Sequence, residues 1–208
     1  MILVLLGLNV LGILFQYYFE IGSIELIDFN KEHNLPTFYS SLALLIASIL
    51  LFAVAMMKRA RKTSYILWLG LCSIFLFLSF DEIMTIHERL VLPTRKYLGA
   101  TGFLYYTWVI PYGVILTVFL VTYTKFLIGL PRKTIKLFIL SGSIFVIGAI
   151  GIEMIGGRHE DLYGIENAQY AIYYTIEEFL EMGGIALFIY AILSYMVDEF
   201  GFVKVELK

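Results

Sequence analysis

The stretch Tyr173-Tyr174-Thr175-Ile176-Glu177-Glu178-Phe179-Leu180-Glu181-Met182-Gly183-Gly184 carries three carboxylates within five residues of an otherwise apolar segment. That segment, about Ala168–Val197, is long enough to cross a membrane as a helix. A charged side chain inside hydrocarbon costs at least about 2.5–3.5 kcal/mol on insertion scales. These glutamates must therefore be protonated, paired, bathed in water or bound to a cation. The stretch predicts a polar site inside a membrane-embedded helix bundle.

The composition agrees with a membrane protein and excludes several other classes. Of the 208 residues, 60% are hydrophobic and only 15% are charged, and the mean hydropathy is +0.86. A soluble domain is typically about 45–50% apolar and about 25% charged. The net charge of −2 gives no basis for nucleic-acid binding. The single cysteine, Cys72, rules out a disulfide framework and a cysteine-based metal site.

Six segments have the length needed to cross about 30 Å of hydrocarbon. We therefore predict an all-α fold, a polytopic membrane bundle of six transmembrane helices that forms a single domain over residues 1–208. The third segment is uncharged as far as Phe80 and is expected to continue as one helix through Glu88. The predicted spans are Met1–Phe19, Thr37–Met57, Thr63–Glu88, about Thr101–Thr124, about Leu137–Ile155 and about Ala168–Val197.

The distribution of basic residues predicts the orientation of the bundle. The loops at 58–62 and 125–136, together with Lys204 and Lys208, hold ten of the fifteen basic residues. Because short loops rich in Lys and Arg remain in the cytoplasm, we place this side and both termini there, in a multi-pass protein of the cell membrane. Most acidic residues then belong to the outer loops or the outer halves of the helices.

Three non-consecutive segments are expected to bring their ionisable groups to the same depth. At a rise of 1.5 Å per residue, Glu177, Glu181 and Asp81 lie roughly 12, 18 and 13 Å below the outer surface. Helical spacing places these side chains on one face of each segment. The residues expected to face the interior are Asp81, Glu88, Glu153, Glu177 and Glu181, with His87, Glu82, Glu178 and Tyr174 beside them.

Carboxylates and histidine without thiolates form a ligand set that suits a divalent metal ion. Mg, Ca, Mn and Fe fit it best, and Zn is possible through His87. Glu177 or Glu88 is the candidate general base. Glu82 is expected to form an ion pair with Arg89, seven residues along the same helix. The predicted metal ligands are Asp81, His87, Glu88, Glu153, Glu177 and Glu181.

Three motifs resemble those of a group of prokaryotic multi-pass membrane proteins of unknown function. They are Asp81-Glu82-x5-Glu88, Glu153-Met154-x-Gly156-Gly157 and Glu177-Glu178-x-x-Glu181-Met182-Gly183. The resemblance covers the third, fifth and sixth predicted spans, about half of the chain. The resemblance implies a shared architecture and a shared site, and it implies no particular reaction.

The sequence leaves three functions open. The first is a metal-dependent membrane enzyme that acts on a lipid or another amphiphile, for which membrane lipid is the expected partner. The second is a cation- or proton-coupled transporter of an ion or small molecule, and the third is an accessory subunit of a membrane complex. The acidic residues gather in the outer half, with little polar continuation inward. This asymmetry favours a one-sided pocket, and hence the enzyme.

Overall fold

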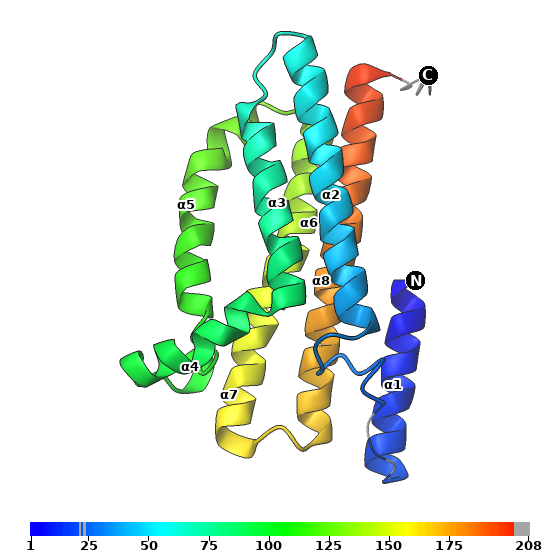
Figure 1. Cartoon of the computed structure of the whole chain (residues 1–208), viewed down its shortest axis with the longest axis vertical. Helices are drawn as coiled ribbons and strands as arrows, with labels where there is room; N and C mark the ends of the chain where they lie inside the picture. The colour runs from blue at the N-terminus through cyan, green and yellow to red at the C-terminus, as the bar shows by residue number, and fades with distance from the viewer. Residues whose placement is uncertain (21, 23, 202–208) are drawn as a thin grey trace.

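The structure, a computed structural model, describes residues 1–20, 22 and 24–201 (Figure 1). This part of the chain is all-α, as predicted. Lys204 and Lys208, and with them the end of the predicted domain, lie outside the described residues. The α-helices are α1 (Ile2–Tyr18), α2 (Leu35–Ala60), α3 (Ile66–Met84), α4 (Ile86–Leu98), α5 (Val109–Ile128), α6 (Arg132–Val146), α7 (Glu153–Tyr163) and α8 (Ala168–Phe200).

Among the described residues, five helices are long and apolar enough to cross a membrane. They are α2, α3, α5, α8 and the continuous helix Arg132–Tyr163, in which a π-helical segment, Ile147–Ile152, joins α6 to α7. The predicted span Met1–Phe19 forms α1, an apolar helix of 17 residues that is shorter than the other five. A multi-pass membrane protein is therefore indicated, whereas the predicted number of six spans is not confirmed.

The helices run between two ends of the bundle (Figure 1), and the sequence shows that the loops at these ends differ in charge. The basic end holds the α2–α3 connection, the α5–α6 connection and the end of α8, and the acidic end holds α4 and the connection at 164–167. The two basic loops thus share one side, as predicted. The start of α1 lies about midway along the bundle, beside α8. The prediction that both termini lie on the cytoplasmic side is therefore not confirmed.

Local sequence signals set the ends of the longest helices. The Asn34 side chain accepts a hydrogen bond from the Thr37 N–H (3.1 Å) at the start of α2, where Pro36 also lies. The side chain of Asn167 caps α8 in the same way. At the other end of α2, basic residues in the last turn complement the partial negative charge of the helix terminus.

The predicted third helix is interrupted, which corrects the expectation of one helix through Glu88. Thr85 adopts a left-handed conformation (φ 48°, ψ 44°), so that α3 ends at Met84 and α4 begins at Ile86. The new helix turns away across the acidic end of the bundle (Figure 1). Residues 81 and 88 consequently belong to different elements.

Two other predicted spans have different bounds in the structure. The predicted span at Thr101–Thr124 starts later, because residues 102–104 form a short 3₁₀ turn and α5 begins only at Val109. Pro111 consequently lies in the first turn of α5, where its missing N–H costs no helical hydrogen bond. The predicted span at Leu137–Ile155 is part of a longer helix that continues to Tyr163.

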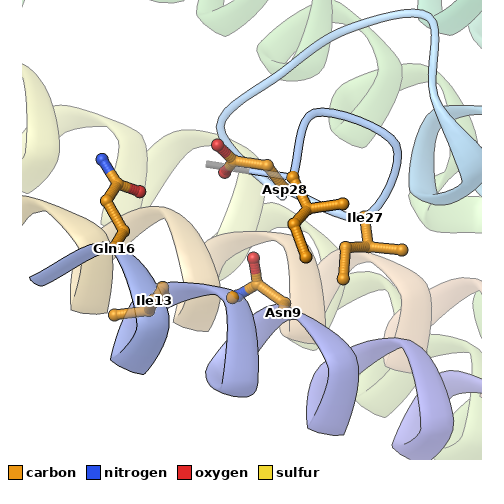
Figure 2. Close-up of a pocket in the computed structure, with 7 residues that line it drawn as sticks. Asn9, Ile13, Gln16, Ile27 and Asp28 are labelled. Carbon is orange, nitrogen blue, oxygen red and sulfur yellow. The ribbon is translucent and has the colours of Figure 1, made fainter. Parts of the chain in front are cut away.

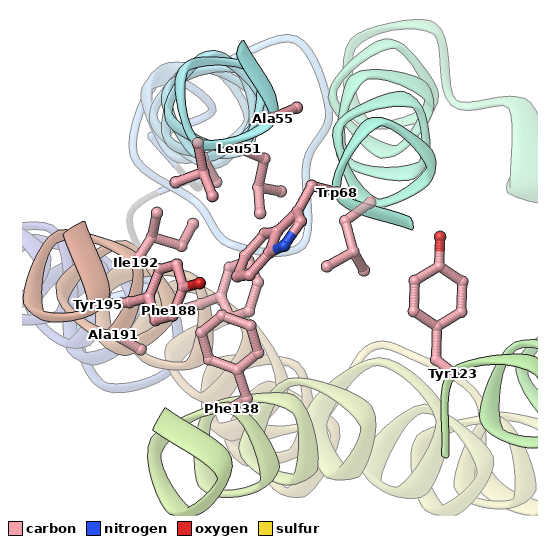
Figure 3. Packing of buried hydrophobic residues seen from close by; sticks show 12 residues of the cluster. Leu51, Ala55, Trp68, Tyr123, Phe138, Phe188, Ala191, Ile192 and Tyr195 are labelled. Atoms are coloured by element: carbon pink, nitrogen blue, oxygen red, sulfur yellow. The ribbon is translucent and has the colours of Figure 1, made fainter. Parts of the chain in front are cut away.

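The apolar core fills the basic end of the bundle (Figure 3). Trp68 of α3 stacks on Tyr195 of α8 with ring centroids 4.8 Å apart, and Leu51 of α2 is fully buried beside them. Tyr123 joins α5 to this core, because its hydroxyl donates to the Leu67 carbonyl at 3.1 Å. Elsewhere α5 has few close backbone contacts with the other helices. The basic end is therefore tightly packed, and α5 stands apart over much of its length.

Candidate functional site

A cavity of about 910 Å³ lies between α3, α5, the α6–α7 helix and α8. The predicted metal ligands all line this cavity, although they come from four different helices. The supporting residues Glu82, Glu178 and Tyr174 line it too, whereas Arg89 does not. The structure thus brings together Asp81, Glu82, His87, Glu88, Glu153, Tyr174, Glu177, Glu178 and Glu181.

The cavity wall changes from apolar to polar toward the acidic end on α3, α5, the α6–α7 helix and α8. Along α3, Leu71 and Phe75 precede Asp81; along α8, Phe188 lies on the basic side of Glu177 and Glu181. The same order holds on the α6–α7 helix, which carries carboxylates as well. It also holds on α5, but there aromatic groups with polar atoms take the place of carboxylates. The cavity therefore has an apolar part toward the basic end and a polar part toward the acidic end.

Asp81 is held by contacts that the helix break creates. Its carboxylate accepts a hydrogen bond from the backbone N–H of His87 at 2.9 Å and lies 3.3 Å from the ring Nδ1 of the same histidine. The hydroxyl of Tyr112 in α5 donates to its second oxygen at 3.0 Å. Asp81 therefore caps the first turn of α4 and orients His87, and both of its oxygens are engaged.

Glu153 and two glutamates of α8 meet where α8 approaches the π-helical segment. Glu153 accepts a hydrogen bond from the indole N–H of Trp108 at 3.0 Å, and it lies close to Glu177 and Glu181. The approach depends on Gly148, since an added Cβ would lie 2.9 Å from the Glu177 carbonyl oxygen. A π-helical turn beside an acidic cluster is typical of functional sites.

Sequence reasoning missed the aromatic residues that hold the carboxylates. The hydroxyl of Tyr106 donates to Glu160 and lies 2.8 Å from the hydroxyl of Tyr170. Trp108 and Tyr112 come from the same stretch, which was interpreted as the start of a span. The density of aromatic groups with polar atoms at 105–112 was the available signal, but it equally fits a belt at the membrane interface.

Nearby carboxylates raise the pKa of three titratable groups that lie outside the membrane-spanning helices. Burial and the charge of Glu88 raise the pKa of Glu32 above its usual range. Burial and the charge of Glu153 raise the pKa of Glu88, against the opposing effect of His87. Burial lowers the pKa of His87, but its hydrogen bond to Asp81 and the charges of Asp81, Glu88 and Glu153 outweigh burial and raise it. The acidic part of the cavity therefore favours positive charge.

Two findings within the described residues bear on the finer points of the site. No three His, Cys, Asp or Glu side chains are arranged to hold a metal ion as they stand, so the metal site stays a prediction. The expected ion pair between Glu82 and Arg89 does not form, because the break at Thr85 leaves Arg89 exposed on α4 while Glu82 lines the cavity.

A second pocket lies between α1 and the segment at 24–28 (Figure 2). Its volume of about 10 Å³ is near the minimum for one water molecule. Asn9 beside it donates to the hydroxyl of Thr175 at 2.9 Å and accepts from the Phe29 N–H at 2.9 Å. This pocket therefore belongs to the contact that fastens α1 to α8.

Comparison with known proteins gives one match. The sequence model of a family described as "Domain of unknown function (DUF8692)" matches residues 1–196. No curated protein and no solved structure matches the chain.

Proposed function

The chain belongs to the family described as "Domain of unknown function (DUF8692)", and since that description states no function, we propose one from the chemistry of the cavity. We propose a multi-pass protein of the cell membrane that holds a divalent cation among the carboxylates that line the cavity and acts on the polar group of a lipid-like amphiphile. One observation carries the proposal: the carboxylates of separate helices line a single cavity that continues into an apolar part.

The charge balance of the cavity supports a bound cation. Among the described residues, Arg95 is the sole lysine or arginine that lines it. Its guanidinium lies 3.5 Å from the ring centroid of Tyr105 and its Nε donates to the Tyr105 carbonyl. Arg95 is thus engaged away from the glutamates of α8. Carboxylates at close range repel one another unless a cation or a shared proton lies between them.

Glu153, Glu177 and Glu181 are the ligands that we assign to the cation. Their oxygens suit Mg²⁺, Ca²⁺ or Mn²⁺, and the three side chains would have to change position to enclose an ion. Asp81 and His87 are already engaged with each other, so we assign them the positioning of α4. Glu177 remains the candidate base for a water molecule polarised by the cation.

The distribution of polar groups favours an enzyme over a transporter. A transport route needs polar groups across the whole membrane, but the cavity lining toward the basic end consists almost entirely of Leu, Ile and Phe side chains. Ser141 and Ser143 are the polar side chains there, and the hydroxyl of Ser141 donates to carbonyls of its own helix. The polar groups of the cavity therefore lie toward the acidic end and do not continue across the membrane.

Ion binding by the purified protein tests the proposal. After treatment with a chelator, the protein in detergent is titrated with Mn²⁺, and bound ion is counted by electron paramagnetic resonance. We expect one Mn²⁺ per chain and a higher melting temperature. The double variant Glu177→Gln/Glu181→Gln should bind at least about tenfold more weakly.

Glu166→Gln is the matched control, because Glu166 is exposed and does not line the cavity. It should bind Mn²⁺ as the unaltered protein does. Absence of stoichiometric binding for Mn²⁺, Mg²⁺, Ca²⁺ and Zn²⁺ alike, with no change in melting temperature, would remove the basis of the proposal.

A further inference from the structure

The cavity has a side opening between α5 and α6. Ile115 and Leu120 of α5 line the cavity and yet are 61% and 51% exposed. On α6 and the π-helical segment, Ile139 and Ile147 also line it and are 55% and 53% exposed. Side chains that line the cavity and still have more than half of their surface exposed lie at a part of the wall that neighbouring helices do not cover. All four are aliphatic, so this part of the wall suits contact with the hydrocarbon of a membrane and not with water.

The opening is wide because α5 is attached mainly at its two ends. Tyr112 binds Asp81 near the acidic end, and Tyr123 binds the Leu67 carbonyl near the basic end. Within α5 itself, only Val109 and Tyr123 are buried. On the facing helix Gly142 lines the cavity and is exposed, and an added Cβ there would meet nothing within 4 Å.

The order of polar and apolar groups along the cavity matches that of a lipid in one leaflet. The lining of α8 runs from Tyr170 to Phe188, which corresponds to about 27 Å along the helix axis. A lipid in the leaflet at the acidic end has its polar group at the level of the carboxylates and its chain pointing to the membrane centre. The cavity has the same order of polar and apolar groups, so a lipid from that leaflet would enter it by moving sideways, without turning over.

We infer that a hydrocarbon chain of a membrane lipid passes between α5 and α6 and occupies the apolar part of the cavity, drawn from the leaflet at the acidic end. The inference refines the proposed function, because it names the ligand class and its route. It does not require a metal ion, since the chain contacts only apolar side chains. With the basic loops in the cytoplasm, the leaflet is the outer one.

Photolabelling with a lipid tests this inference. The full-length protein is placed in vesicles of phosphatidylcholine that contain a phosphatidylcholine analogue with a diazirine in the middle of one acyl chain. After irradiation, labelled residues are located by mass spectrometry. We expect labels on Phe119 and Phe138, which line the cavity, in addition to the outward-facing Val114 and Val118.

Gly142→Trp should obstruct the opening and lower labelling of Phe138 at least fivefold. Gly113→Trp is the matched control: Gly113 lies on α5, has nothing within 4 Å of an added Cβ and does not line the cavity. It should leave the labelling of Phe138 unchanged. Equal labelling of Phe138 in the two variants would overturn the proposed route.

The labelling of the unaltered protein decides the inference even if a tryptophan variant does not fold. Labels confined to Val114 and Val118 would refute a chain inside the cavity. Vesicles with the probe in one leaflet only test the side, and equal labelling of Phe138 from both leaflets would refute the leaflet assignment. The experiment is run with chelator and with Mn²⁺. Labelling of Phe138 without any Mn²⁺ binding would uphold the lipid site while refuting the cation site.

Discussion

At the basic end of the bundle, Leu51, Trp68 and Phe188 fill the space between α2, α3 and α8. At the acidic end, the same α3 and α8 are separated by a cavity with carboxylates on its wall. Apolar side chains in a membrane gain little from leaving lipid, so van der Waals contact has to hold the helices together. The tight end provides that contact, which allows the other end to remain open around a polar site.

The largest difference between the two ends should appear in a matched pair of leucines. Leu51 is 0% exposed within the core, whereas Leu116 of α5 faces the cavity. Leu51→Ala should lower the free energy of unfolding by about 2–5 kcal/mol, because the surrounding helices cannot close the new space. Leu116→Ala should cost less than about 1 kcal/mol, because that side chain faces the cavity and is not packed within the core of the bundle. Denaturation in mixed micelles measures both.

Comparable losses for the two leucine variants would contradict this division of the bundle. The matched design removes differences in residue type, since both changes delete the same atoms. A small effect of Leu51→Ala would mean that the basic end can repack, and a large effect of Leu116→Ala would mean that this side chain packs against other helices as a core residue does.

A smaller effect is expected where the two regions meet, at Gly148. A methyl group there would lie 2.9 Å from the Glu177 carbonyl oxygen and 3.0 Å from the Leu180 Cβ. Gly148→Ala should therefore push the π-helical segment away from α8 and cost about 1–3 kcal/mol. Because Glu153 follows that segment, binding of Mn²⁺ should weaken as well. Thermal melting and ion titration of the same samples measure the two effects.

Gly183→Ala is the control for Gly148→Ala, because Gly183 lies in α8 and has open space around it. There the change should be neutral or stabilise the helix by up to about 1 kcal/mol, since alanine favours a helix more than glycine does. If both variants behaved alike, the close approach at Gly148 would not be the feature that positions the glutamates.

Much of the architecture was predictable because it rests on segment length and charge. Long apolar runs and the basic loops at 58–62 and 125–136 predicted the long helices and the side that these loops share. Helical periodicity also selected the glutamates that line the cavity. These signals are local and repeat over many residues, so a single sequence contains them.

The features that shape the site were not predictable, because they depend on contacts between distant residues. Residues 81–88 contain neither glycine nor proline, and nothing local marks Thr85 as the break between α3 and α4. The left-handed conformation is stabilised by Asp81, which caps α4, and by Tyr112 from another helix. The cavity has no sequence signal either, because it depends on the distance between α5 and α6.

The smallest expected effect concerns the contact between Asp81 and His87, which joins α3 to α4 at the acidic end of the bundle. The pKa of His87 is raised in the folded protein, because the hydrogen bond to Asp81 and the surrounding carboxylates outweigh burial. A raised pKa means that the protonated ring stabilises the fold fully below the unfolded value of about 6.5, and that this contribution is lost as the pH rises through the folded value. The free energy of unfolding should therefore fall by about 0.5–1.5 kcal/mol as the pH rises from about 6.5 through the folded pKa of His87, and the melting temperature should fall with it.

Asp81→Asn and His87→Gln separate this contact from other groups that titrate. His87→Gln should remove the part of the pH dependence that lies above pH 6.5, and Asp81→Asn should reduce it, because the charges of Glu88 and Glu153 still act on the imidazole. Glu166→Gln should retain it. A pH profile of Asp81→Asn that coincides with that of the unaltered protein would mean that another group titrates, and that Asp81 holds α4 only through the backbone N–H of His87. In that case helix capping by Asp81 alone would hold α4 in position at the acidic end.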